Sequence, residues 1–190
     1  MSQPKTKEQK RELMLQRIKG LRLMDDDFMT KCFEDNIECT ELLLHIIIGK
    51  SDLRVKSART QYTIKNLQGR SVCLDIFAED SADKKYNVEI QRADKGAGAK
   101  RARYNSSLID SNTILPGDDV DKLPETYVIF ITENDVFGKD KPIYHMNRVI
   151  EETGESFGDG SHIIYVNGAY RDDTPLGKLM HDFPVRIQLI

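Results

Sequence analysis

A short apolar run, Tyr127 to Thr132 (YVIFIT), constrains the fold more than any other segment of this 190-residue chain. It combines β-branched and aromatic residues without polar alternation, which is typical of a strand buried on both faces. Such a strand needs a packed layer on either side, and helices usually provide these layers. The run therefore predicts an interior strand of an α/β sheet.

Helical spacing and strand composition mark the segments around this run. We expect helices near 28–33, from residue 38 or 40 to 48, and over 99–112, and strands at 54–65, 71–78, 85–91, 127–132, 143–148 and 162–166. Strands joined by short turns pair antiparallel, whereas a strand that follows a crossover helix is usually parallel to its neighbour. The sequence predicts an α/β fold with a mixed β-sheet flanked by helices, in the order αβββαβ.

Length and composition indicate one globular domain. The chain is 39% hydrophobic and 31% charged, which is ordinary for a soluble protein. Its longest apolar run, Leu42 to Ile48, is interrupted by His45 and is far shorter than the roughly 20 residues that span a bilayer. Residues 1–13 are polar and contain no apolar stretch of a secretion signal. We therefore expect a cytoplasmic protein with no membrane partner.

The charges are distributed unevenly along the chain. Its net charge is −3, but residues 5–22 carry seven basic against two acidic side chains, a net +5, and residues 92–103 carry five against one, a net +4. We expect 1–24 to be a loosely attached basic segment. The second run, with Arg92, Lys95, Lys100, Arg101 and Arg103, is a candidate DNA-binding surface. Tyr104 could stack near nucleic acid or pack partly buried.

Two carboxylates face each other in the predicted hairpin of 71–78 and 85–91. If the turn is centred on Ala82, Asp75 and Glu89 are each seven positions away and lie opposite one another. Alternation places Val72, Leu74, Ile76 and Ala78 on one face with Tyr86, Val88 and Ile90, and leaves Asp75, Glu89 and Gln91 on the other. Directly opposed like charges destabilise a sheet, and a divalent cation between them would reverse this effect.

Mg²⁺ suits this arrangement. It takes oxygen ligands and keeps several waters, so Asp75, Glu89 and the carbonyl of Ile90 would be sufficient protein ligands, with Mn²⁺ as a substitute. Such an ion activates water for attack on a phosphodiester. The three cysteines lack a CxxC pair, and the histidines lack HxxxH or HExxH spacing, so no zinc site is indicated.

Several segments resemble a known family in the same order. SVCLDIFAED, KYNVEIQRAD and AKRARYNSSLID, together with DDDFMTKCFED, ECTELLLHIII and LPETYVIFIT, resemble the transposases of the PD-(D/E)XK nuclease family, which are related to the recombination-promoting nucleases. The resemblance covers roughly 25–171, which we expect to be the nuclease-like domain. It implies a restriction-endonuclease-like core.

The resemblance also assigns roles to individual residues. It implies that Asp75 and Glu89 are metal ligands. Glu41 matches an acidic position on the first core helix, although Glu38 lies one turn earlier and could serve instead. The family's lysine position falls on Gln91, which can hydrogen-bond a water or phosphate oxygen but carries no charge. The end of the chain departs from the family, and we expect 172–190 to be a tail that is truncated or altered.

The hypothesis that follows is a Mg²⁺-dependent DNA endonuclease linked to recombination or a mobile element. An alternative is a catalytically inactive nuclease-fold protein that binds nucleic acid or a protein partner. Cleavage of RNA remains open, because hydrolysis of either phosphodiester needs the same site. Double-strand cleavage by one small site per chain would most simply use a homodimer.

Overall fold

A computed structural model describes residues 6–92 and 96–186 of the chain. Lys95 of the second basic run and the last four residues of the predicted tail lie outside the described residues. The helices are α1 (Lys7–Lys19), α2 (Asp26–Phe33), α3 (Ile37–Ile48), α4 (Ala99–Thr113) and α5 (Pro175–Asp182), with a short 3₁₀ helix η2 (Val120–Lys122). The strands are β1 (Val55–Ile64), β2 (Val72–Asp80), β3 (Lys85–Gln91), β4 (Thr126–Thr132), β5 (Ile143–Met146) and β6 (Ser161–Asn167).

The six strands form one mixed sheet in the order β1-β2-β3-β4-β6-β5. β1, β2 and β3 pair antiparallel, β4 pairs parallel to β3 after the α4 crossover, and β6 continues parallel to β4. β5 pairs antiparallel to β6 at the far edge. The predicted mixed sheet flanked by helices is confirmed, and it is the arrangement of a restriction-endonuclease-like core.

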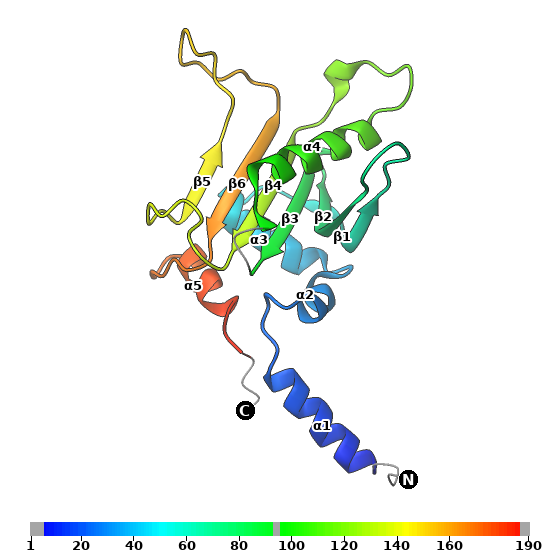
Figure 1. Ribbon diagram of the computed structural model, residues 1–190, viewed down its shortest axis with the longest axis vertical. Helices are drawn as coiled ribbons and strands as arrows, with labels where there is room; N and C mark the ends of the chain where they lie inside the picture. The colour runs from blue at the N-terminus through cyan, green and yellow to red at the C-terminus, as the bar shows by residue number, and fades with distance from the viewer. Residues whose placement is uncertain (1–5, 93–95, 187–190) are drawn as a thin grey trace.

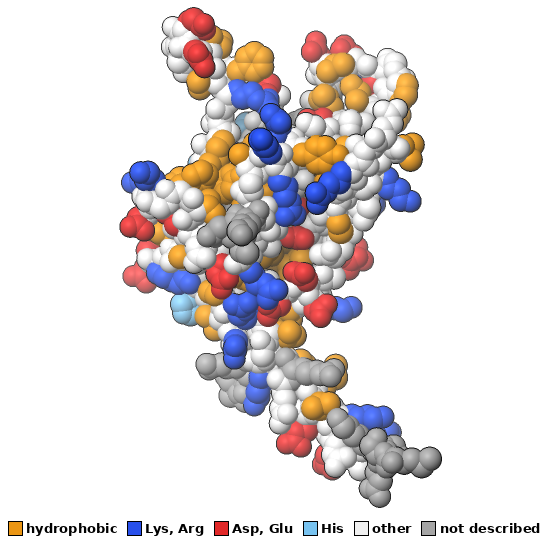
Figure 2. Space-filling view, in the orientation of Figure 1, with side chains coloured by type: hydrophobic (Ala, Val, Ile, Leu, Met, Phe, Trp, Pro, Cys, Tyr) orange, Lys and Arg blue, Asp and Glu red, His pale blue; other side chains and the backbone are white. Residues whose placement is uncertain are grey.

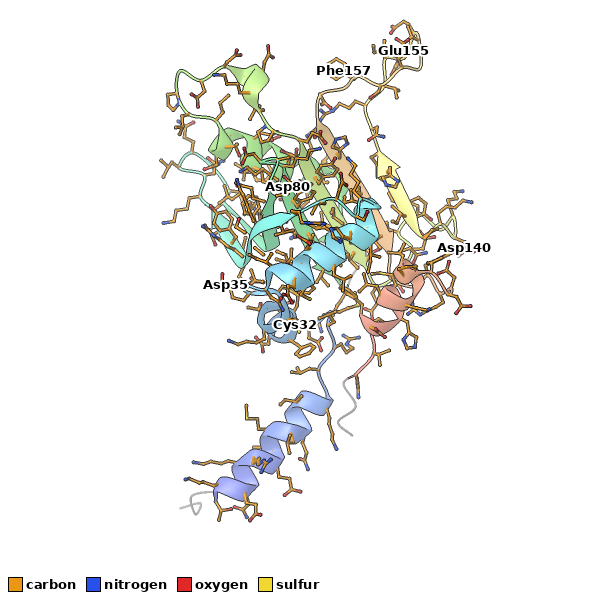
Figure 3. The ribbon with its side chains drawn as sticks, turned by 180° about the vertical axis from the view of Figure 1, so that it is seen from behind. Cys32, Asp35, Asp80, Asp140, Glu155 and Phe157 are labelled. Carbon is orange, nitrogen blue, oxygen red and sulfur yellow. The ribbon has the colours of Figure 1, made fainter. Side chains whose placement is uncertain are left out.

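Helices cover both faces of the sheet. α4 crosses one face, and α2, α3 and α5 lie on the other (Figure 1). Figure 3, from behind, shows α3 across the near face. The β4 strand is buried along its whole length because Ile129 and Ile131 pack under α3 and α5, while Val128 and Phe130 pack under α4. The prediction of a strand buried on both faces is confirmed.

The basic N-terminal segment contains α1, which extends away from the sheet (Figure 1). Every described side chain of α1 except that of Ile18 is exposed. Attachment to the body begins at Arg22, which pairs with Glu133 at 3.1 Å, and continues at Met24, which is buried in the core. Within the predicted C-terminal tail, α5 is amphipathic and buries Leu176 and Met180 against that same core.

The turn between β2 and β3 is held by one buried side chain, Asp80, which lies just before it (Figure 3). Asp80 Oδ1 accepts hydrogen bonds from the backbone N–H groups of Ala82 and Lys84, each at 2.9 Å, and Oδ2 accepts from the Tyr86 hydroxyl at 2.8 Å. Ile76 pairs with Val88 and Ala78 with Tyr86, so the turn is centred on Ala82 as predicted. This turn fixes the register that positions the carboxylates.

The side-chain alternation of β2 differs from the prediction at its start. Ile76 and Ala78 pack with β3 residues under α3, but Val72 and Leu74 belong to a separate cluster with Leu108 of α4. Opposite Asp75, Gln61 of β1 has a positive φ of 49°. The strand pair bends here, and periodicity alone does not reveal a bend.

Gly168 permits the close approach of two chain segments at the end of β4. Its N–H donates to the Thr132 carbonyl at 2.7 Å, and a Cβ at this position would lie 2.3 Å from the same oxygen. We expect Gly168→Ala to lower the free energy of unfolding by about 2 kcal/mol, because the added methyl group would force the backbone around Thr132 to shift. Urea denaturation measures this change. Gly98→Ala is the control, because nothing lies within 4 Å of its added Cβ. An equal loss in both variants would contradict this account.

Candidate active site

Asp75 lies where β2 separates from β3. The pairing of these two strands ends at Ile76 and Val88, one residue short of the predicted Asp75 and Glu89 pair. The Asp75 carboxylate then accepts a hydrogen bond from the Ile90 N–H at 2.9 Å. Burial raises the pKa of Asp75, and the hydrogen bond from Ile90 and the charge of Arg101 act against that increase. A carboxylate thus occupies the opening between the strands.

Glu89 extends from β3 on the α4 face of the sheet, and its side chain is 0% exposed. Burial, followed by the nearby Asp75 carboxylate, raises the pKa of Glu89 to about 7 from its ordinary value of 4.5. Glu89 therefore carries a charge near neutral pH only at a considerable energetic cost. Asp75 accepts from the N–H of Ile90, the residue that follows Glu89, so the two acids lie at the same end of the hairpin.

α4 supplies the polar partners of Glu89. Arg101 forms an ion pair with Glu89 Oε2, and Asn105 Nδ2 donates to Oε1 at 3.3 Å. The Oδ1 of Asn105 and both amide atoms of the buried Asn87 have no hydrogen-bond partner among the described residues. One guanidinium thus faces two carboxylates in a buried polar setting, which leaves an excess of negative charge.

A groove of about 1040 Å³ lies beside this pair, between the start of β2 and α4. Arg101 and Asn105, the two partners of Glu89, line it together with Val72 and Cys73, which precede Asp75. Further basic residues line the same groove: Arg70, Lys100 and Arg103. Figure 2 shows basic side chains over α4 on this face. The carboxylate pair therefore adjoins a surface suited to a polyanion.

Gln91 ends β3 beside the pair and is half-buried. Its amide lies against the backbone of Gly96, since a Cβ on that glycine would be 1.8 Å from Gln91 Oε1. Ile90, the predicted carbonyl donor, is buried, and its N–H is bonded to Asp75. The last three residues of β3 thus contribute a carboxylate, a backbone group and an amide at one end of the strand.

Comparison with protein families identifies the chain. A family model described as PD-(D/E)XK nuclease family transposase matches residues 32–169. The chain belongs to this family. Neither a curated protein nor a solved structure matches it. Membership implies nuclease chemistry, and the match includes Asp75, Glu89, Gln91 and the groove-lining part of α4.

Glu41 also falls within the family match, but the structure does not bring it to the pair. Its Oε2 accepts from the Val55 N–H at 2.9 Å, and its Oε1 lies 3.7 Å from Arg54 Nη1. Val55 pairs with Asp80, which lies five residues along β2 from Asp75. At about 3.3 Å per residue, Asp80 and Asp75 are roughly 16 Å apart along the strand. Helical periodicity predicts the helix correctly but does not show which end of the sheet this side chain approaches.

The predicted DNA-binding residues divide into two groups. Lys100, Arg101, Arg103 and Tyr104 line the groove. The hydroxyl of Tyr104 donates to the Arg70 carbonyl, and its half-buried ring packs beside the cluster of Ile64, Leu74, Leu108 and Ile109. Arg92 lies elsewhere, in an ion pair with Asp25 at 2.7 Å. Arg92 therefore joins β3 to the start of α2.

Sequence patterns miss two charged residues near the site. Arg70 lines the groove from the turn before β2, and Asp26 of α2 is close enough for its charge to raise the pKa of Asp75. Asp26 lies in the acidic run DDD, which by itself indicates only the start of a helix. Arg70 directly precedes the predicted strand 71–78, but only the tertiary structure shows that it lines the groove and that Asp26 lies near Asp75.

Proposed function

We propose that this chain is a Mg²⁺-dependent DNA endonuclease that serves recombination or a mobile element. The observation that carries this proposal is the position of Asp75 and Glu89 beside a groove lined by four basic residues. Family membership supports the nuclease part. Two copies of the chain would be the simplest means of cutting both strands.

A divalent cation suits the donors at this site. Two converging carboxylates share one guanidinium, so a hard cation would relieve their repulsion. The proposed protein ligands are Asp75, Glu89 and the carbonyl of Ile90. The described residues contain no group of three or more His, Cys, Asp or Glu that could hold a metal. Bound Mg²⁺ or Mn²⁺ would supply Lewis-acid activation of water and of the phosphodiester.

The protein side chains position the substrate and screen its charge. Gln91 would donate a hydrogen bond from its amide to a phosphate oxygen or to the attacking water. Lys100 and Arg103 would hold the DNA backbone in the groove by charge. The buried amide of Asn105, which donates to Glu89 Oε1, would hold the Glu89 carboxylate in position. No helix in the described part of the chain could cross a membrane.

DNA binding should depend on salt through the groove residues. Changing Lys100 and Arg103 together to Gln should make the slope of log K for DNA binding against log[salt] less negative by about 2, since each phosphate contact contributes about one. Fluorescence anisotropy with a short labelled duplex measures this slope. Lys178→Gln, an exposed charge on α5, is the control. An unchanged slope in the double variant would place DNA away from the groove.

Supercoiled plasmid tests the proposed activity directly. Wild-type protein with Mg²⁺ or Mn²⁺ should nick the plasmid, and Asp75→Ala should leave it intact. If the wild type leaves plasmid intact but still retards it in a gel, the alternative of an inactive nucleic-acid-binding protein is correct. If it does neither, a protein partner is the better interpretation. Competition with RNA in the nicking reaction identifies the preferred substrate.

A further inference from the structure

Arg101 connects the carboxylate pair to the basic groove. Its Nη2 pairs with Glu89 Oε2, its Nη1 donates to the Gly96 carbonyl at 3.1 Å, and its guanidinium lies 5.9 Å from the Phe130 ring centroid. The side chain is 39% exposed, whereas that of Glu89 is 0% exposed. Arg101 therefore reaches a buried acid from the surface of the groove.

Arginine stays protonated at any pH the protein tolerates, so Arg101 cannot leave Glu89 by losing its proton. Its charge also acts on Asp75, which places the guanidinium near both acids. A divalent cation attracted to the same two carboxylates would repel this guanidinium and compete for Glu89 Oε2. Asn105 holds the other oxygen, Oε1, so Glu89 can stay in position while its cationic partner changes.

The groove offers Arg101 another anionic partner. Because its exposed part already lines the groove, the guanidinium can turn outward without crossing the core. A DNA phosphate accepts two hydrogen bonds from a guanidinium, which compensates for the lost carboxylate. Exchange of Arg101 between two anions is thus sterically and electrostatically feasible.

We propose that Arg101 is an exchangeable counterion, paired with Glu89 before a divalent cation binds and with a DNA phosphate afterwards. This inference rests on the proposed function. Arg101 then competes with the cation for Glu89, and its release to a DNA phosphate couples cation binding to DNA binding. Since binding free energies are linked reciprocally, the cation should strengthen DNA binding by the same factor as DNA strengthens cation binding.

Calorimetric titration of Mn²⁺ into the full chain without DNA tests the competition. Arg101→Ala and Arg101→Gln should each bind Mn²⁺ roughly tenfold more tightly than wild type, a typical size for such coupling. The glutamine variant keeps a hydrogen-bond donor for Glu89 if the alanine variant does not fold. Lys178→Gln, which removes an exposed charge from α5, outside the groove, should leave Mn²⁺ affinity unchanged.

The outcomes separate this inference from the proposed function. If wild type binds Mn²⁺ and both Arg101 variants bind it equally or more weakly, the inference fails and the endonuclease proposal stands. If wild type binds no Mn²⁺ and nicks no plasmid, both fail. Duplex affinity measured in Ca²⁺ and in chelator gives a second readout: the increase with Ca²⁺ should be large in wild type and lost in Arg101→Gln. An equal increase in both would overturn the coupling.

Discussion

Glu89→Gln should lower the rate of plasmid nicking roughly 1000-fold, since loss of the proposed metal ligand would remove several kcal/mol of transition-state stabilisation. The substitution keeps the size of the side chain and its hydrogen-bond acceptor for Asn105, which donates to Glu89 Oε1. It removes the charge that would hold the cation. Initial rates of nicking at saturating Mg²⁺ measure the effect.

Glu41→Gln provides the matched comparison. The structure places Glu41 at the start of β1, where an amide oxygen can still accept the Val55 N–H. This variant should nick plasmid within about tenfold of wild type, because Glu41 lies away from the site and its hydrogen bond with Val55 can be kept. Full activity in Glu89→Gln, or loss of activity in Glu41→Gln equal to that in Glu89→Gln, would contradict the assigned site.

We expect the same Glu89→Gln substitution to stabilise the metal-free protein at alkaline pH. The pKa of Glu89 is about 7 in the folded chain against 4.5 ordinarily, so burial favours the protonated acid. As pH rises from 4.5 to 7, the unfolded chain releases this proton before the folded chain does. The free energy of unfolding therefore falls by about 3 kcal/mol and does not recover above pH 7. Glutamine carries no charge and avoids this loss.

Urea unfolding in chelator at several pH values measures the difference between wild type and Glu89→Gln. Between pH 4 and pH 8.5, the free energy of unfolding of the variant should increase by about 3 kcal/mol relative to that of wild type. Most of this change should occur between about pH 4.5 and 7. Mn²⁺ should then stabilise wild type but not the variant. A variant less stable than wild type at pH 8.5 would show that the Arg101 ion pair outweighs the burial of Glu89.

Local patterns predict most of the sheet and the position of the hairpin. The apolar run of β4 predicts a strand between two helical layers, because only such a strand tolerates apolar residues on both faces. The polar turn around Ala82 predicts the β2 and β3 register, and Asp80 with its three hydrogen bonds explains why that register is held. This register places Asp75 and Glu89 at the same end of the hairpin, one residue beyond the last pair, Ile76 and Val88.

The parts of the fold that local patterns do not predict depend on tertiary contacts. Val72 and Leu74 leave the expected face because the strand pair bends beside Gln61, and a period of two residues carries no sign of a bend. The sequence does not predict α5, because its short amphipathic pattern lies in the segment expected to be a tail. Thr174 nevertheless caps this helix. Asp26 approaches the site from α2, which is distant in sequence, and Arg70 reaches the groove from the turn just before β2.

Anomalous scattering from crystals soaked in Mn²⁺ tests the central claim most directly, because it locates the ion without reference to activity. We expect one strong peak between the carboxylates of Asp75 and Glu89, close to the Ile90 backbone, and its loss in crystals of Asp75→Asn. A peak held by other residues, or none at this position in a protein that nicks plasmid with Mn²⁺, would contradict the assignment of these two acids as metal ligands.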